Sequence, residues 1–527
     1  MSSVTESLPV SPETRGIARN ASILALGNVT SRVLGLMREM VKAKLFGSGP
    51  SVDALTLVIT IINQVYDLVT GGIVNSALVP VFNEYTSEDR QEELWRLASL
   101  LLTLATVAVS TLVLGIVWFA PQVVSVFALL SGGKSPEDMT LAVWLLRLAS
   151  PAVIFLSLSG IITSLLYALR RFTLPAFTSA VYNATMVVVA LVLWKLAGVT
   201  AMALGALVGA AAQIALQLPG LRHTRLRPTL NWRHAGLRRI FRLYLPIIGV
   251  TLVSQAAVYF GVGVGWAFKA GLSWMNYATT LYQFPLGLVA TAVSVAILPT
   301  LALQARQAEQ DFKPTLVQGL NLVLLLIVPA TVGLFVLAQP IVGLVFERGA
   351  QKASDTTMTA LVLQFFLVGL SFAAVDQVLI FAFYARQDTL TPALVGVFSV
   401  GIYVAVVLLL RRPLGIFSLM VADSVKQITH ALVTGALLSR RLRGFRQTTL
   451  WPTLGKILIA AAAMGLGVAA ALVGLDRLGV NFGFLRYAIE VGGPGVVGVG
   501  IYFALVSRLN IAEARVITSL VQQKLGV

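Results

Sequence analysis

The chain contains no cysteine, which excludes disulfides, thiolate metal sites and cysteine nucleophiles. Charge is also scarce, because only 12% of its 527 residues are charged, whereas soluble domains have about a quarter. The three histidines are scattered without metal-ligand spacing. Neither a Ser/His/Asp order nor a phosphate-binding GxxxxGKS/T motif is present. We therefore expect no catalytic residues, no metal and no cofactor, and a protein that is not an enzyme.

Long apolar runs take the place of charge. Hydrophobic residues make up 57% of the chain, and runs of about 20 residues, each long enough to cross a bilayer, recur almost from end to end. The sequence predicts an all-α, polytopic membrane protein of about fourteen transmembrane helices. Their predicted centres lie near residues 32, 68, 108, 155, 187, 208, 253, 290, 328, 370, 402, 427, 464 and 499.

The formal charge of +17 is distributed in short basic clusters between these runs. The clusters lack the aromatic interleaving of a nucleic-acid binder, so no nucleic-acid partner is expected. With a cytoplasmic N-terminus, about 23 basic residues fall inside, about 10 outside and about 6 within spans, as the positive-inside rule requires. The basic stretch Leu221–Arg242 is interpreted either as a topology signal or as a site for anionic lipid headgroups.

An internal repeat indicates two lobes. The segment YALRRFTLPAF at Tyr167 resembles YARQDTLTPAL at Tyr384, and ALVPVF at Ala77 resembles AILPTL at Ala296, both about 218 residues later. Six spans fit this interval, which predicts parallel repeats around a central cavity, as in alternating-access transporters. The predicted segments are a disordered cytoplasmic tail (1–14), an N-terminal lobe with helices 1–6 (15–220), a basic cytoplasmic linker (221–241), a C-terminal lobe with helices 7–12 (242–446), and helices 13–14 with the C-terminal tail (447–527).

Charged residues inside a span are costly, and they mark candidate sites. Arg32 and Arg38 lie in the first predicted span, together with Glu39 and Lys42. Two inward guanidinium groups would suit a diphosphate, although the same residues could extend to a membrane interface. Asp53 opens the second span, where an N-cap role is favoured over ligand contact.

Seven stretches resemble the MurJ (MviN) family of lipid II flippases, within the multidrug/oligosaccharidyl-lipid/polysaccharide exporter superfamily. They are TSRVLGLMREMVKAKLFGSGPSVDAL, ALVPVFNEY, FTLPAF, SWMNYATTLYQFPLGL, ILPTL, LVFERGA and FYARQDTLTP, in order from about residue 19 to beyond 440. The resemblance implies fourteen helices, with two six-helix lobes around a cationic central cavity. It also implies that the last two helices form a groove for a polyprenyl tail.

The resemblance carries over residue by residue only in part. It implies that Arg32 and Arg38 bind the diphosphate and that Asp53 belongs to the substrate site. Two further cavity arginines of the family are replaced, because INQVYDLVTGGIVN places Tyr66 and YATTLYQ places Thr280 at those positions.

The sequence thus predicts a flippase that moves lipid II, an undecaprenyl-diphosphate-linked peptidoglycan precursor, to the outer leaflet by alternating access. The alternative is a divergent exporter of another polyprenyl-linked glycan, because Tyr66 and Thr280 remove two cations. The expected location is the inner (plasma) membrane, multi-pass, with a cytoplasmic N-terminus. The expected partners are the lipid-linked precursor, membrane lipids and a coupling ion.

Overall fold

The computed structural model describes residues 12–71, 77–222, 224–229, 234–445, 448–477 and 484–514. Within these ranges every regular element is a helix, which confirms the all-α prediction. Most of the predicted tail, residues 1–11, lies outside the described part, and helix α1 begins at Pro12. The chain divides into two compact units, Met1–Lys42 with Ala54–Leu252 and Ala43–Asp53 with Val253–Val527.

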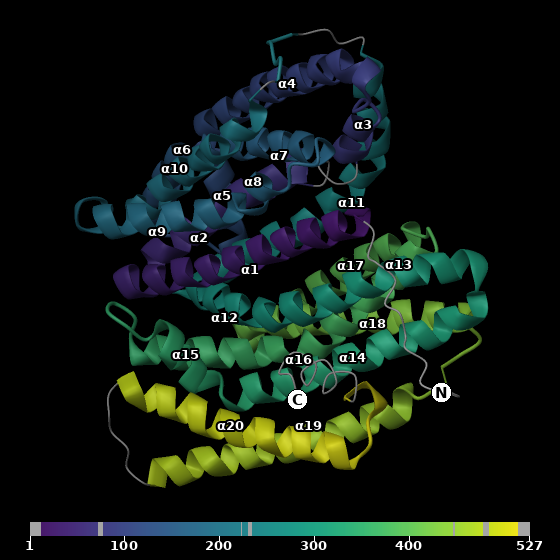
Figure 1. Ribbon diagram of the computed structural model, residues 1–527. Coiled ribbons are helices and arrows are strands. Elements are labelled where there is room, and N and C mark those ends of the chain that lie inside the picture. Colours follow the sequence, from purple (N-terminus) through teal and green to yellow (C-terminus); the bar gives the residue numbers. More distant parts are fainter. Residues whose placement is uncertain are drawn as a thin grey trace. The chain divides into compact units, whose positions relative to one another are not determined.

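The first unit contains the helices up to the start of α11, shown from purple to teal in Figure 1. They are α1 (Pro12–Phe46), α2 (Pro50–Tyr66), α3 (Val79–Asn83), α4 (Gln91–Trp118), α5 (Ala120–Ser131), α6 (Pro136–Ala149), α7 (Ala152–Ala168), α8 (Thr173–Ala176), α9 (Thr178–Ala197), α10 (Thr200–Gln217) and α11 (Ala235–Trp266). A π-helical turn, Asp67–Gly71, follows α2. The ends of α1 and α11 lie in the second unit.

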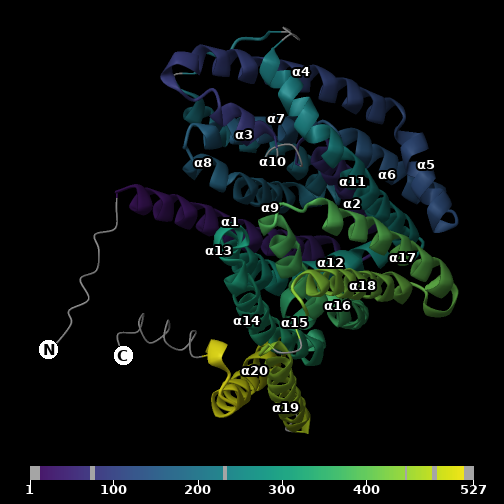
Figure 2. The ribbon, with the colours of Figure 1, turned by 90° about the vertical axis from the view of Figure 1, so that its right-hand side faces the viewer.

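The second unit contains α12 (Gly271–Pro285), α13 (Thr291–Gln307), α14 (Glu309–Val336), α15 (Ala338–Phe346), α16 (Ala353–Ala385), α17 (Leu390–Leu414), α18 (Phe417–Arg441), α19 (Leu450–Arg477) and α20 (Phe484–Arg508). A second π-helical turn, Leu286–Ala290, joins α12 to α13. Figures 1 and 2 both show α19 and α20 packed side by side as a hairpin in this unit. Their buried side chains, such as Met464 and Tyr502, pack against α14.

Eleven described helical segments are long and apolar enough to cross a membrane, so the chain is a multi-pass membrane protein. The closely spaced spans predicted near 187 and 208 are the separate helices α9 and α10. Three further long helices, α1, α11 and α18, stand where spans were predicted near 32, 253 and 427. The count of fourteen stays a prediction. The second span runs from Pro50 to Thr70, so its predicted centre near 68 was wrong and lies close to its end.

The internal repeat is confirmed by the backbone. Arg170 and Gln387, about 217 residues apart, both have positive φ, at 58° and 60°. Gly198 and Gly415 have the same separation, and both have a φ of 54°. Helices α4 and α14 also correspond, because each ends before a residue with nearly the same backbone angles, Phe119 and Leu337. The two units are therefore built on one duplicated plan.

Local sequence explains where many helices begin and end. Ser135 caps α6, because its hydroxyl accepts the Asp138 amide at 3.1 Å while Pro136 occupies the first turn. Pro151 separates α6 from α7, whereas the corresponding helix α16 is continuous over 33 residues. Gly27 allows α1 to approach α8, since a Cβ there would lie 2.2 Å from the Ala176 carbonyl oxygen.

Candidate functional site

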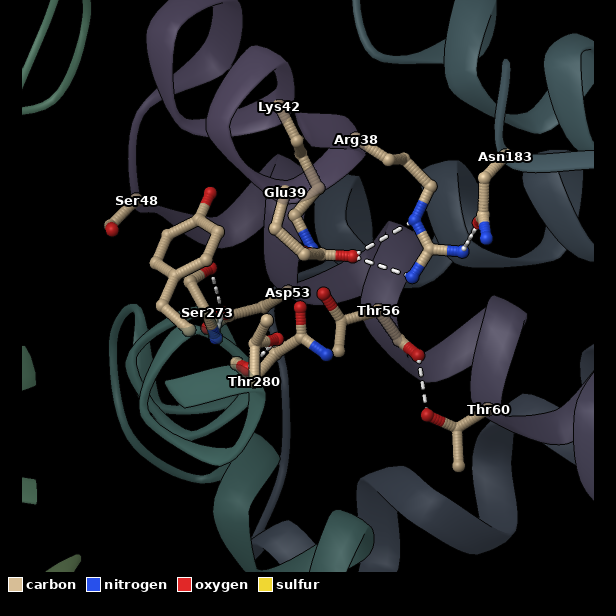
Figure 3. A network of polar contacts seen from close by, with 12 residues as sticks. Arg38, Glu39, Lys42, Ser48, Asp53, Thr56, Thr60, Asn183, Ser273 and Thr280 are labelled. Atoms are coloured by element: carbon tan, nitrogen blue, oxygen red, sulfur yellow. Dashed lines mark hydrogen bonds and ion pairs between the residues drawn. The ribbon is translucent and has the colours of Figure 1, made fainter. Parts of the chain in front are cut away.

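The charges of α1 form a compact cluster in the first unit. The Arg38 Nε and Nη2 atoms donate to one Glu39 carboxylate oxygen, at 3.0 and 2.7 Å, and Lys42 forms an ion pair with the other oxygen. The Arg38 Nη1 donates to Asn183 Oδ1 of α9 at 2.9 Å, as Figure 3 shows. The Glu39 and Lys42 side chains are only 4% and 6% exposed, whereas that of Arg38 is 23% exposed. Arg38 is therefore the more accessible cation of the cluster.

Asn183 holds this cluster in place from α9. Its amide nitrogen donates to the Ser31 carbonyl on α1 at 3.2 Å, and its amide oxygen accepts from Arg38. A single amide thus contacts α1 at two places, about two helical turns apart. Nothing in the sequence marked Asn183, since it lies in an otherwise apolar helix, and only its polarity in a span could have drawn attention to it.

The arrangement makes Glu39 an internal anion. A guanidinium group has five N–H donors, and three atoms of the Arg38 group already donate to Glu39 and Asn183. A phosphate binding bidentately must compete with Glu39 for the same Nε and Nη2 edge. The cluster of Arg38, Glu39 and Lys42 carries a net charge of about +1, which favours an incoming anion. The sequence showed Glu39 next to Arg38 but did not indicate this competition.

Arg32 and Tyr66 lie elsewhere in the first unit. Arg32 is half-buried on α1, about 9 Å along the helix axis from Arg38. Tyr66 is the half-buried last residue of α2, immediately before the π-helical turn. No described hydrogen bond joins the two predicted diphosphate arginines to one another.

In the second unit, Asp53 binds the beginning of α12. Its Oδ1 accepts the backbone amide of Ser273 at 2.8 Å and the Ser273 hydroxyl at 2.6 Å, and the residue is fully buried. Figure 3 shows Asp53 beside Ser273. The expected N-cap role in α2 was wrong, because this carboxylate satisfies a first-turn amide of α12, where helix N-terminal partial charge favours an anion.

The loop that precedes Asp53 is fixed by backbone contacts within the same unit. The Tyr277 hydroxyl donates to the Gly47 carbonyl at 2.8 Å, and the Ala350 amide donates to the Lys44 carbonyl at 2.9 Å. Gly47 has a φ of +68°, and a Cβ there would lie 2.6 Å from the Ala350 carbonyl oxygen. The loop can therefore hold Asp53 against α12 only with glycine at position 47.

Thr280 lies two turns beyond Ser273 on α12. Its hydroxyl donates to the Asn276 carbonyl at 2.9 Å, a bond within its own helix. The half-buried side chain thus offers a ligand an acceptor oxygen and no positive charge. The two predicted residues of this unit, Asp53 and Thr280, do not share a described hydrogen bond. Asp53 contacts Ser273, and Thr280 bonds within its own helix.

An apolar pocket of about 670 Å³ also belongs to the second unit. Its walls come from α14, α16, α18 and α19, with Phe335, Phe372 and Trp451 among the larger side chains. Thr331 and Ser371 are polar residues in the lining, and their hydroxyls lie 3.2 Å apart. A cavity of this character suits a hydrocarbon chain.

Comparison with known proteins assigns the family. The family model described as "Lipid II flippase MurJ" matches residues 42–489. The chain belongs to the MurJ family. A probable lipid II flippase MurJ of Vibrio cholerae is 28% identical over 520 residues, covering 94% of this chain and 96% of the relative. The lipid II flippase MurJ of Burkholderia cenocepacia is 29% identical over 378 residues, covering 70% and 73% of the two chains.

Solved structures show the same fold. An inward closed lipid II flippase MurJ matches with a TM-score of 0.76 at 22% identity, covering 92% of this chain and 98% of that one. An inward-facing multidrug transporter of the MATE family matches with a TM-score of 0.67 at 14% identity, covering 80% and 96%. The fold of the chain therefore agrees with the MurJ resemblance of its seven sequence stretches.

Proposed function

We propose that the chain is a lipid II flippase that moves its lipid-linked substrate across the membrane by alternating access. The observation that carries this proposal is the match of the MurJ family model to residues 42–489, together with a partly exposed Arg38 that a diphosphate can reach. The relatives named above are called lipid II flippases, which favours this substrate over another polyprenyl-linked glycan. The chain binds and moves its substrate without making or breaking covalent bonds, and it is not an enzyme.

The substrate has two parts that the described residues can accommodate separately. The diphosphate is a dianion, and Arg38 with Lys42 provides positive charge on α1. The polyprenyl tail is a hydrocarbon, and the pocket bounded by α14, α16, α18 and α19 offers an apolar surface of matching character. Asp53 would contribute to this site indirectly, because it fixes the beginning of α12, the helix that carries Thr280.

Complementation tests this function directly. A strain depleted of its own lipid II flippase should grow when it expresses this chain, and purified protein should retain lipid II in native mass spectrometry. Failure to support growth, while the protein is present in the membrane at normal levels, would reject lipid II as the substrate. Growth without retained lipid II would indicate weak binding, which the replacement of two arginines by Tyr66 and Thr280 also predicts.

We also propose that the N-terminus is cytoplasmic, which rests on the distribution of basic residues between the spans. The absence of native cysteine makes this testable with single cysteines at Thr229, which follows the first half, and at Arg440, in the last turn of α18 at the end of the second half. Gly444 is less suitable, because its φ of +82° disfavours a side chain. Both positions should react only with membrane-permeant maleimides, and labelling of either in intact cells by an impermeant maleimide would invert the topology.

A further inference from the structure

A buried ionisable group joins three helices of the second unit. The His430 Nδ1 of α18 lies 2.6 Å from Asp376 Oδ1 of α16, and its Nε2 lies 3.2 Å from the Pro392 carbonyl oxygen of α17. The Thr434 hydroxyl donates to the same Asp376 oxygen at 2.9 Å. The His430 and Asp376 side chains are 12% and 9% exposed.

Asp376 lies deep in α16, one of the eleven span-length helices, and His430 lies in α18, where the sequence predicted a span. Asp376 is about 14 Å along the axis from the end of α16 at Ala385, and His430 is about 16 Å from the end of α18 at Arg441. These distances are close to half the thickness of the hydrocarbon core. Ionisable side chains at such a depth cost several kcal/mol unless they are paired, and they usually serve a function.

The first unit contains the neutral counterpart of this cluster. About 217 residues earlier, the repeat places Ser159, Gln213 and Gln217 at the positions of Asp376, His430 and Thr434. They also bond one another, because the Ser159 hydroxyl donates to Gln213 Oε1 at 3.1 Å and Gln217 Nε2 donates to Ser159 Oγ at 2.6 Å. The duplicated helices α7 and α10 thus pack through the same positions without any ionisable group. Packing alone does not require Asp376 and His430.

The two partners of His430 determine how many protons the cluster needs. The Pro392 carbonyl can only accept a hydrogen bond, so Nε2 must carry a hydrogen. One further proton between Nδ1 and Asp376 Oδ1 satisfies the second contact, whether it resides on the imidazole or on the carboxyl group. If that proton leaves to water, the neutral imidazole keeps a single N–H. One ring nitrogen then directs its lone pair at an oxygen lone pair, and one contact becomes repulsive.

The surrounding charges leave the deprotonated state uncompensated. On α18, Lys426 lies one turn before His430, but it is paired with Asp423 at 2.5 Å and lies 5.5 Å from the ring centroid of Tyr403 on α17. On α16, Tyr384 lies two turns beyond Asp376. The described hydrogen bonds from α13 and α14 nearest to Asp376 come from the neutral hydroxyls of Thr291 and Thr331, which contact Gln377 and Ser371. At the end of α16, Arg386 is paired with Glu309 of α14, and Tyr282 of α12 packs against Phe366 of α16. Loss of the proton therefore leaves the Asp376 carboxylate as a net buried charge.

We propose that Asp376 and His430 form a proton-binding site whose occupancy holds α16, α17 and α18 together. Release of the proton to water breaks one of the two contacts of His430 and favours movement of α17 relative to α18, and rebinding restores both contacts. The coupling of this cycle to substrate movement rests on the proposed flippase function. The proton site itself does not, because it is complete without substrate.

The protonation of His430 can be measured without transport. Full-length protein with ¹⁵N-labelled histidine, in nanodiscs and without lipid II, would carry His223→Gln and His234→Gln so that only the His430 ring is observed. Because the charged Asp376 carboxylate holds the remaining N–H on Nδ1, we expect the Nε2 resonance to move from a protonated form to a bare nitrogen between about pH 5 and about pH 9, while Asp376→Asn shifts this transition. Constant nitrogen shifts over that range would overturn the proposal.

The repeat supplies a matched variant for the coupling step. The double change Asp376→Ser with His430→Gln installs the neutral pair that the first unit already uses, so packing should persist and the Tm should stay close to that of the unmodified protein. In liposomes containing lipid II, transport by the unmodified protein should change up to about tenfold per pH unit on one limb of its profile, and transport by the double variant should not. His234→Gln is the control, because His234 lies outside the cluster and should leave the profile unchanged.

The possible results separate the two proposals. An unchanged pH profile in the double variant, or in His430→Gln alone if the double variant does not fold, would reject coupling through this site. A lower Tm with a normal profile would assign the pair to packing only. A clear ring titration in a protein that moves no lipid II would keep the proton site and reject the proposed flippase function.

Discussion

In the first half of the duplicated chain a cluster of buried charges lies on α1, and in the second half a buried ionisable pair lies between α16 and α18. Arg38, Glu39 and Lys42 form the α1 cluster, whereas the corresponding part of α11, from Leu243 to Trp266, contains no charged residue. Conversely, the ionisable pair Asp376 and His430 replaces a neutral pair in the first half. The two halves retain one backbone plan and have diverged in the groups that bind charge.

This difference indicates that the two halves bind different charged species. A net positive cluster with an accessible guanidinium suits an anionic substrate, and a buried histidine–carboxylate pair suits a proton. Neither half holds both arrangements at the described positions, although the duplicated helices would have allowed it. The comparison predicts that changes on α1 alter substrate binding, while changes between α16 and α18 alter the response to pH.

The largest effect is expected from Arg38→Ala. It removes the more accessible cation of the α1 cluster and leaves the buried Glu39 with Lys42 as its remaining ion-pair partner. Complementation should be lost while expression is retained, and Arg38→Lys should restore it poorly because Lys lacks the planar fork. The control is Arg96→Ala, which removes an exposed arginine whose surface ion pair contributes little. Normal growth with Arg38→Ala would show that α1 does not bind the diphosphate.

A smaller effect, of opposite sign on binding, is expected from Glu39→Gln. This change removes the internal anion that competes for the Nε and Nη2 edge of Arg38. We expect lipid II to bind about tenfold more tightly and the protein to lose several degrees of Tm, since two buried cations lose their counter-ion. Native mass spectrometry and a thermal shift assay measure the two quantities. Unchanged affinity would mean that the diphosphate approaches Arg38 from another edge.

Restoring the two arginines that the family resemblance implies should change the affinity for lipid II severalfold. Tyr66→Arg combined with Thr280→Arg introduces the two arginines that the family resemblance implies at these positions. For a lipid II flippase, the added charge should maintain or increase lipid II affinity, although the empty state pays for two desolvated cations. The matched control is Tyr66→Phe with Thr280→Val, which keeps the size of both side chains without charge. Loss of binding in the arginine variant would favour a less charged substrate.

The fold could be predicted from sequence more completely than the site. Span-length apolar runs fixed the helical class, and the spacing of Tyr167 and Tyr384 revealed the repeat that Arg170 and Gln387 confirm in the backbone. Site contacts depend instead on which distant helices pack together. The Asp53–Ser273 bond joins residues 220 positions apart, and nothing in the local pattern distinguished it from an N-cap in α2.

The same reasoning explains why the polar partners were missed. Asn183 lies in a mainly apolar helix, and His430 is one of several polar residues in α18, so no helical or strand period distinguishes either of them. Their roles follow from neighbours on other helices, Arg38 for Asn183 and Asp376 for His430. The repeat offset, once applied residue by residue, could have exposed the second pair, because it aligns His430 with Gln213.

The smallest predicted effect concerns the loop before α17, where the halves differ in charge sign. Asp388 accepts the Thr391 amide at 2.9 Å and Arg441 Nη1 at 2.6 Å, whereas Arg171 at the corresponding position donates to the Gly220 carbonyl at 2.5 Å. Partial burial raises the pKa of Asp388, but hydrogen bonds from Thr391 and Arg441 outweigh it and lower the pKa to about 2. Asp388→Ala should lower the free energy of unfolding by about 1 kcal/mol near neutral pH. Asp388→Asn should lower it less, because the Asn side chain can still accept the hydrogen bond from the Thr391 amide.

The pH dependence of the stability lost in Asp388→Ala shows whether the charge of Asp388 is responsible for it. A carboxyl group whose pKa is lower in the folded protein than the ordinary 3.8 stabilises the fold fully above that value, and the contribution is lost as the pH falls towards 2. The Tm difference between the unmodified protein and Asp388→Ala should therefore be constant from pH 7 to about pH 4 and shrink below it. A Tm difference that persists unchanged at about pH 3 would show that the hydrogen bond with Thr391 stabilises the fold and that the ion pair with Arg441 does not contribute.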